Sequence, residues 1–201
     1  MNEPQRPEPS QIWDDQRVQE VLTSLSQAIR VGYEAFARQR PQTPLALVGI
    51  RTGGAHLAKR MQKTLSADLG QDVPMGVLDI TLYRDDMMTG QATRIPFLRG
   101  TDIPFDVEGM YVVLVDDVLF TGRTVRSALD ALTDFGRPTQ IKLAVLVDRG
   151  FRELPIQPDF CGASFESQLN EQIKLHLKEE GHTGDGLWSI RKVKAANGSD
   201  A

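Results

Sequence analysis

The chain has 201 residues, of which 40% are hydrophobic and 25% are charged, so one globular domain with a sizeable core is predicted. Its formal net charge of −4 at pH 7 argues against polyanion binding as the main activity of the whole protein, although a local basic patch can override the total. The single cysteine, Cys161, excludes an internal disulfide and fits a reducing compartment.

Both ends of the sequence are predicted to lie outside the folded domain. Residues 1–13 are expected to form a disordered tail, because the first ten are rich in proline and poor in apolar residues. Residues 14–190 are expected to form the domain, and the polar residues 191–201 a frayed tail. No apolar run could span a bilayer and no secretion signal stands out, so we expect a cytoplasmic protein without a membrane partner.

The first part of the domain is predicted to alternate helix, strand and helix. A helix begins at Asp14 or Asp15, either of which can cap it, and its apolar residues recur on one face. The aliphatic run at residues 45–50 predicts a buried strand, and a further helix follows to about residue 65. Between them, the Arg-Thr-Gly-Gly loop of residues 51–54 can cradle an anion, although a glycine pair before a helix is more often only a turn.

The next segment combines a strand with a long loop. Residues 77–83 alternate in polarity and predict a strand, whereas residues 87–107 lack any periodicity. A loop of this length is usually functional or disordered. Arginines in and beside it suit a diphosphate, and a reactive sugar intermediate needs shielding from water, so we favour a mobile lid. A solvated excursion of the chain stays open as the alternative.

The chain is organised around residues 112–124. The aliphatic residues 112–115 predict a strand buried on both faces, and apolar residues at helical spacing follow the stretch. Asp116, Asp117 and the Thr-Gly-Arg-Thr turn of residues 121–124 therefore lie where a strand leads into a helix. In open α/β sheets this position, outside the carboxyl ends of the strands, is where ligands bind.

The chemistry of this stretch indicates a ribose 5-phosphate as the ligand. Amides and hydroxyls of residues 121–124, at the positive end of a helix, suit a phosphate, and Asp116 and Asp117 can accept hydrogen bonds from sugar hydroxyls. The Thr-Gly-Arg-Thr turn argues against a response-regulator receiver. Phe120 and Thr121 stand where a DDxxD magnesium motif needs its last acid, and a solvated strand end with a helix cap is the remaining alternative.

The second half of the chain adds two more strands. Residues 141–147 predict a buried strand that delivers residues 148–155 to the same edge of the sheet, where they are candidates to read a second substrate. Alternation of Ile173, Leu175 and Leu177 predicts a short strand. The three histidines lack metal-ligand spacing, so no metal ligand is assigned among them.

Residues 112–124 closely resemble the signature of type I phosphoribosyltransferases that binds 5-phosphoribosyl 1-diphosphate (PRPP), an aliphatic strand followed by two acids and a Thr-Gly-x-Thr loop. The resemblance implies an α/β domain of the type I phosphoribosyltransferase fold, a mostly parallel sheet flanked by helices with a flexible lid loop and a small hood. It also implies Mg²⁺ bound with PRPP and pyrophosphate. The residues it assigns to PRPP are Asp116, Asp117, Val118, Leu119, Phe120, Thr121, Gly122, Arg123 and Thr124.

The superfamily pattern also implies a role for each part of the site. Asp116 and Asp117 would hold the ribose hydroxyls, and residues 121–124 the 5-phosphate. Arg84 would close over the pyrophosphate, so Asp116, Asp117 and Arg84 are the expected catalytic residues, acting through positioning and charge without a covalent nucleophile. The residues assigned to pyrophosphate, from the resemblance of the glycine loop, are Arg51, Thr52 and Gly53.

Residues 79–86, 100–106 and 146–156 are similar to hallmark segments of the PyrR family. That family combines uracil phosphoribosyltransferase activity with regulation of pyrimidine biosynthetic genes, through the leader of their messenger RNA. The implied reaction converts uracil and PRPP into UMP and pyrophosphate, in a homodimer or larger homo-oligomer. The residues expected to frame the uracil are Asp148, Arg149 and Ile173.

Binding of the pyr mRNA leader has less support than catalysis. RNA-binding members of the family use basic positions on the first helix, in the pyrophosphate loop and after the Arg-Glu-Leu-Pro motif, and lost phosphate contacts weaken binding. We therefore place catalysis first. A regulator of pyr mRNA that senses nucleotides with weak or no catalysis, and a phosphoribosyltransferase for another base, stay open. The uncharged residues at the RNA-contact positions are Ser24, Gln27, Gly53, Phe151, Gln157 and Ala163.

Overall fold

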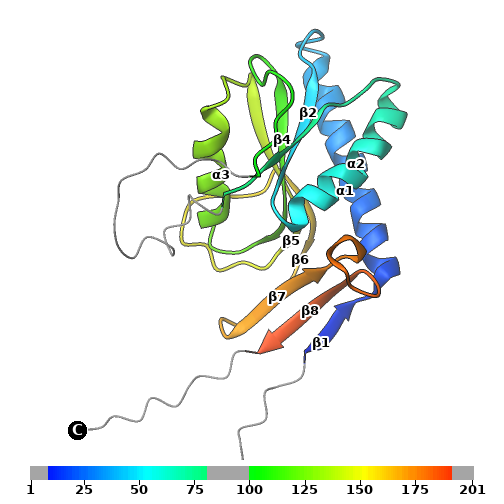
Figure 1. The fold of residues 1–201 in the computed structure, drawn as a ribbon, viewed down its shortest axis with the longest axis vertical. Coiled ribbons are helices and arrows are strands. Elements are labelled where there is room, and N and C mark those ends of the chain that lie inside the picture. Colours follow the sequence, from blue (N-terminus) through cyan, green and yellow to red (C-terminus); the bar gives the residue numbers. More distant parts are fainter. Residues whose placement is uncertain (1–8, 81–99, 192–201) are drawn as a thin grey trace, which may run out of the picture.

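Helices cover both faces of a parallel sheet in the structure, a computed structural model that describes residues 9–80 and 100–191 (Figure 1). Helices α1 (Asp15–Ala37) and α2 (Gly53–Leu69) cover one face, and α3 (Arg123–Thr133) covers the other. The predicted α/β class is confirmed. The five strands, in their order across the sheet, are β3 (Met75–Leu78), β2 (Leu45–Ile50), β4 (Tyr111–Leu119), β5 (Gln140–Asp148) and β6 (Phe160–Ser164).

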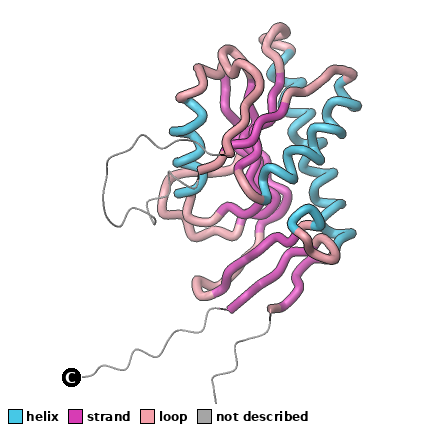
Figure 2. Tube along the Cα trace, in the orientation of Figure 1, coloured by secondary structure: helices cyan, strands magenta, loops and turns pink. Residues whose placement is uncertain are grey.

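A smaller antiparallel sheet, which we call the hood, lies beyond one end of this domain (Figure 2). It consists of β1 (Ser10–Trp13), β8 (Gly186–Arg191) and β7 (Glu171–His176), in that order, with the short 3-10 helix η2 (Lys178–Glu180) between β7 and β8. The prediction of a disordered tail over residues 1–13 is wrong for residues 10–13. They form β1 because β8, far along the chain, supplies a pairing partner, and Ile12 and Trp13 pack against the main core.

Side chains of the parallel strands alternate between two apolar clusters, one on each face of the sheet. Leu47 and Val113 pack with α1 and α2, whereas Val48 and Leu114 pack with α3. All six residues of β2 are buried, which explains its unbroken aliphatic run. None of the described helices is long and apolar enough to cross a membrane.

Two elements differ in length from their predictions. Strand β3 ends at Leu78 and not at residue 83, the end that the sequence predicted. Its partner β2 ends opposite it, at Ile50. Residues 81–83 lie outside the described residues. Helix α2 continues past the predicted end at residue 65 and terminates at Gly70, whose positive φ of 63° suits a helix C-terminus.

The predicted lid divides into two parts. Residues 87–99 lie outside the described residues, so the prediction is untested there. Residues 102–107 do not form a lid, because they pack on the sheet: Asp102 forms an antiparallel bridge with Val77, and Val107 is completely buried. Apolar side chains at alternate positions 103, 105 and 107 supply the burial that holds this segment down.

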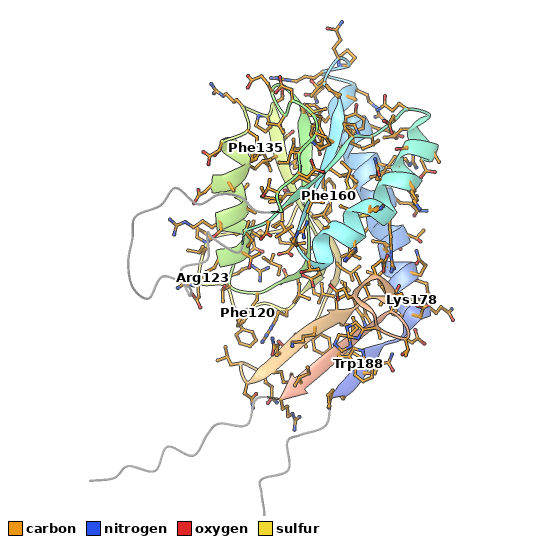
Figure 3. The ribbon with its side chains drawn as sticks, viewed as in Figure 1. Phe120, Arg123, Phe135, Phe160, Lys178 and Trp188 are labelled. Atoms are coloured by element: carbon orange, nitrogen blue, oxygen red, sulfur yellow. The ribbon has the colours of Figure 1, made fainter. Side chains whose placement is uncertain are left out.

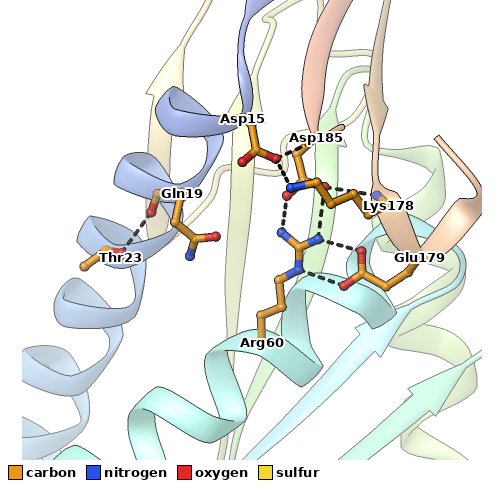
Figure 4. Close-up of polar contacts among 7 residues, drawn as sticks. All are labelled: Asp15, Gln19, Thr23, Arg60, Lys178, Glu179 and Asp185. Atoms are coloured by element: carbon orange, nitrogen blue, oxygen red, sulfur yellow. Dashed lines mark hydrogen bonds and ion pairs between the residues drawn. The ribbon is translucent and has the colours of Figure 1, made fainter. Parts of the chain in front are cut away.

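Charged side chains tie the hood to both helices on its side (Figure 4). Arg60 of α2 donates to both carboxylate oxygens of Glu179, at 2.8 and 2.5 Å, and to both of Asp185, at 2.5 and 3.1 Å. Asp185 also accepts from the Lys178 amide, and its own amide donates to Asp15 of α1. Because Asp185 is only 6% exposed, these partners offset the cost of burying its carboxylate. The Arg60 guanidinium accordingly holds the pKa of Glu179 at about 2.

We expect Arg60→Met to lower the free energy of unfolding by roughly 3 kcal/mol, because it leaves the buried Asp185 carboxylate without its main cation. Arg126→Met is the matched control, since Arg126 makes an exposed pair with Asp130 on α3, and its cost should stay within about 0.5 kcal/mol. Urea unfolding of both variants measures the difference. Equal losses of stability would show that the hood does not depend on this cluster.

Candidate active site

The paired carboxylates lie on β4 beyond the end of β2. Pairing between β2 and β4 stops at Gly49 and Val115, whereas β4 and β5 remain paired as far as Leu119 and Asp148. Asp116 and Asp117 therefore lie inside β4, whereas the sequence predicted that they follow the strand. Pairing with β5 extends β4 beyond the two carboxylates and fixes the backbone that carries them.

The loop before α2 fills the space that β2 leaves. Gly53 lies so close to the carboxylates that a Cβ atom there would come within 2.6 Å of Asp117 Oδ2. A larger residue there would have to displace the Asp117 side chain, whereas glycine permits the approach as it stands. The peptide bond between Arg51 and Thr52 is cis. The structure thus brings the predicted pyrophosphate loop and the predicted ribose carboxylates together.

The two carboxylates have different surroundings. Asp116 is 5% exposed and accepts a hydrogen bond from the Asp117 amide at 3.0 Å, while Asp117 is half-buried and accepts from the Val118 amide at 2.9 Å. Burial raises the pKa of Asp116 well above its usual range, and the neighbouring charge of Asp117 raises it further. Asp117 is the carboxylate with better access to a ligand.

The Thr-Gly-Arg-Thr turn connects β4 to the first turn of α3. Gly122 adopts a positive φ of 91°, which glycine accommodates without strain, and it offers no side-chain cap to the helix. Thr121 Oγ1 accepts from the Arg123 amide at 3.3 Å. The turn lies at the N-terminal, positive end of α3, a place that suits a phosphate group.

A cavity of about 480 Å³ opens beside the end of β5. Asp148 and Arg149, both predicted from the sequence, are in its wall, whereas Ile173 lies in the apolar core and does not line it. The sequence missed the wall from β6 and its following turn, because Phe160–Ser164 lacks the aliphatic run of a buried strand. The residues that line the cavity are Asp148, Arg149, Gly150, Phe151, Ser164, Phe165, Glu166 and Ser167.

Arg149 is held rigidly in the cavity wall. Its guanidinium lies 4.0 Å from the centroid of the Phe120 ring and 5.7 Å from that of Phe151. Its Nε donates to Ser167 Oγ and its Nη2 to the Gln168 carbonyl, both at 3.1 Å. Burial lowers the pKa of Arg149, which nevertheless stays charged near neutral pH. Figure 3 shows Phe120 and Arg123 at the end of the main domain that faces the hood.

Of the remaining residues predicted for the site, Arg51 and Thr52 make no hydrogen bond or ion pair with the carboxylates in the described part of the chain. Arg51 is exposed; its Nε lies 3.9 Å from Asp79 Oδ2, and its Nη2 donates to the Gly100 carbonyl at 3.1 Å. Thr52 is exposed as well, at the start of α2. Arg84 lies outside the described residues. Within the described residues, no group of three His, Cys, Asp or Glu side chains could hold a metal ion.

Comparisons with known proteins show the family and the fold of this chain. The family model of the phosphoribosyl transferase domain matches residues 20–172. Bifunctional protein PyrR of Listeria monocytogenes (serovar 1/2a) is 49% identical over 177 residues, which span 88% of this chain and 93% of the relative. Bifunctional protein PyrR 1 of Lactiplantibacillus plantarum is 49% identical over 178 residues, or 88% and 97%. In fold, a hypoxanthine phosphoribosyltransferase of Trypanosoma cruzi is similar, with a TM-score of 0.67, 18% identity and 92% and 97% coverage.

The parallel sheet, with paired carboxylates and a Thr-Gly-Arg-Thr loop at its strand ends, is that of a type I phosphoribosyltransferase. Such enzymes act on PRPP and a base. Within this class the chain belongs to the PyrR family, since relatives of that name match nearly its whole length at about half identity.

We expect Asp116→Asn to stabilise the fold at neutral pH. A buried carboxyl with a raised pKa opposes folding once pH exceeds about 4, because the unfolded chain then ionises more readily than the folded one. Asparagine keeps the acceptor for the Asp117 amide. The melting temperature of the variant should therefore equal that of wild type near pH 4 and exceed it increasingly toward pH 7. An Asp116→Asn variant less stable than wild type at pH 7 would contradict the raised pKa of Asp116. Asp130→Asn, at an exposed site, is the control.

Proposed function

We propose that this protein is a uracil phosphoribosyltransferase that converts uracil and PRPP into UMP and pyrophosphate. The observation that carries the proposal is the shared edge of the sheet: the carboxylates, the phosphate loop of residues 121–124 and the Arg149 cavity all adjoin the ends of β4 and β5. A nucleoside 5′-phosphate has a sugar, a phosphate and a base that match these three parts.

The reaction needs stabilisation of charge more than a chemical nucleophile. Breaking the bond between C1 and the pyrophosphate builds positive charge on the ribose, which the Asp117 carboxylate would stabilise while holding the hydroxyls. Amides of residues 121–124 would fix the 5-phosphate. The loop of Arg51, Thr52 and Gly53 would receive the departing pyrophosphate beside these carboxylates, with Arg84 closing over it.

The residues present fit Mg²⁺ as the metal cofactor. Mg²⁺ commonly binds through substrate phosphates, waters and only one or two protein carboxylates, so it needs no cluster of protein ligands. Asp117, half-buried and adjacent to Gly53, is the carboxylate best placed to help hold it. When bound, the ion would neutralise charge on the diphosphate group.

Arg149 supports an oxo-pyrimidine as the base. An arginine can only donate hydrogen bonds, and two of its N–H groups are used by Ser167 and Gln168. The remaining N–H groups meet no acceptor in the described part of the chain and can donate to a carbonyl of uracil, whereas an amino group of a base there would face only donors. Ser164, Ser167 and backbone carbonyls of the wall can accept from the N3–H of uracil. Rigid stacking on Phe120 keeps this specificity fixed.

Regulation of pyrimidine genes in response to uridine nucleotides is the second candidate function, supported by the bifunctional name of the relatives. The same site would sense UMP. On α1 the positions associated with RNA contact carry exposed Ser24 and Gln27, and the Ser24 hydroxyl is committed to the Glu20 carbonyl. RNA binding should therefore be weak and should depend on few charges. A homodimer or larger homo-oligomer is the assembly we propose from the family.

The enzyme assay tests the first proposal. We expect UMP formation from PRPP and uracil, with cytosine, hypoxanthine and guanine at least 10-fold poorer substrates. Asp117→Asn should cut kcat/KM roughly 100-fold, as loss of a transition-state contact does. Its stability should stay within about 1 kcal/mol, because Asn keeps the acceptor for the Val118 amide. Asp130→Asn is the matched control; full activity of folded Asp117→Asn would exclude the ribose assignment.

A gel shift with the RNA leader of the protein's own operon tests the second candidate. We expect a weak shift at low salt, an affinity that falls only shallowly as the salt concentration rises, and a stronger shift when UMP is present. The shallow slope follows from the uncharged residues at the contact positions. No shift at low salt, with UMP present and enzyme activity intact, would remove RNA attenuation from the functions of this protein.

A further inference from the structure

Residues 149–156, which we call the brace segment, lie against the phosphate loop. The amides of Glu153 and Leu154 both donate to the Thr121 carbonyl, at 2.9 and 3.1 Å. A Cβ atom on Gly122 would lie 3.4 Å from side-chain atoms of Leu154 and of Ile156. The side chain of Glu153 also pairs with Arg123 at 2.6 Å. The chain that leaves the base cavity therefore returns across the turn proposed to hold the 5-phosphate.

Arg152 is the central side chain of the brace segment. Its Nη2 donates to Asp148 Oδ2 at 2.6 Å and its Nη1 to the Phe120 carbonyl at 2.8 Å. Its Nε donates to the Ile156 carbonyl at 2.9 Å, and Nη1 also reaches the Gly150 carbonyl at 3.2 Å. The side chain is only 14% exposed. One guanidinium thus joins four points of the chain in a fixed plane.

Two of these points belong to the two ends of the nucleotide site. Asp148 is in the wall of the base cavity, and Phe120 immediately precedes the phosphate loop and supports Arg149 through its ring. Asp148 is held from its other side as well, since its Oδ1 accepts from the Gly150 amide at 2.9 Å. The pair between Arg152 and Asp148 therefore fixes the position of the base wall relative to the phosphate loop.

We propose that Arg152 is a positioning residue that sets the spacing between the phosphate loop and the base cavity. The inference rests on the proposed function. Glycosyl transfer requires the base nitrogen to approach C1 of a ribose that is anchored through its 5-phosphate, and small misplacements of reacting groups cost large factors in rate. The role is one of positioning, because all but one of the five guanidinium N–H groups donate to acceptors of the chain itself.

Binding of ligands that do or do not span the site separates this role from a general loss of structure. UMP occupies both ends, whereas ribose 5-phosphate and uridine each occupy one. For Arg152→Lys, which keeps the charge but not the planar fork, we expect calorimetry to show a loss of UMP affinity of about 10-fold or more. Affinities for ribose 5-phosphate and for uridine should change less than about twofold, because each end stays intact.

Kinetics give a second readout. The kcat of Arg152→Lys should fall between about 10-fold and 100-fold, while the KM for PRPP, which does not enter the base cavity, should change less than about twofold. Arg126→Gln is the matched control, since Arg126 is an exposed arginine on α3 outside the site. Arg152→Gln is a harsher variant, and if it does not fold the lysine variant decides.

Two results would overturn the inference. One is wild-type affinity for UMP with wild-type kcat in folded Arg152→Lys. The other is an equal loss of affinity for all three ligands, which would indicate a structural role only. Failure of the proposed function is distinguishable from both, because the wild-type protein itself would then neither form UMP nor bind it.

Discussion

Two adjacent carboxylates at the end of a buried strand are the constraint on which the rest of this site depends. Asp116 and Asp117 repel each other, and burial of Asp116 adds a desolvation cost that its backbone hydrogen bond only partly offsets. The fold accommodates them because β4 stays paired with β5 after its pairing with β2 has ended. The space thus released accepts the close approach of Gly53. Stability is lost at this edge of the sheet, which is where we propose that sugar hydroxyls bind.

The parts of the site are joined by side chains that bind other parts of the protein and not the substrate. Arg152 connects the base wall with the phosphate loop, and Arg60 connects the helix that begins at the pyrophosphate loop with the hood. Both are arginines with nearly all of the guanidinium committed to acceptors in the chain, which suits a rigid connection better than a lysine would. A rigid frame is what a reaction driven by positioning requires.

The sequence predicted what local patterns determine. Aliphatic runs located β2, β4 and β5. The signature on β4 indicated a type I phosphoribosyltransferase, and residues 79–86, 100–106 and 146–156 indicated the PyrR family; the comparisons confirm both. Prediction failed where distant segments decide the structure. Residues 10–13 carry no strand pattern strong enough to reveal their pairing with β8. Sequence spacing likewise did not show that His176 and His182 stack, with their ring centroids 4.0 Å apart. The role of Arg152 depends on backbone carbonyls, which leave no trace in side-chain patterns.

A crystal structure of the protein with UMP tests the central claim most directly, because one ligand must engage three separate parts of the sheet edge. We predict the phosphate at the amides of residues 121–124, the ribose hydroxyls at Asp117 and Asp116, and the uracil in the cavity beside Arg149. A UMP molecule bound elsewhere, or bound with its phosphate away from the turn that begins α3, would contradict the account.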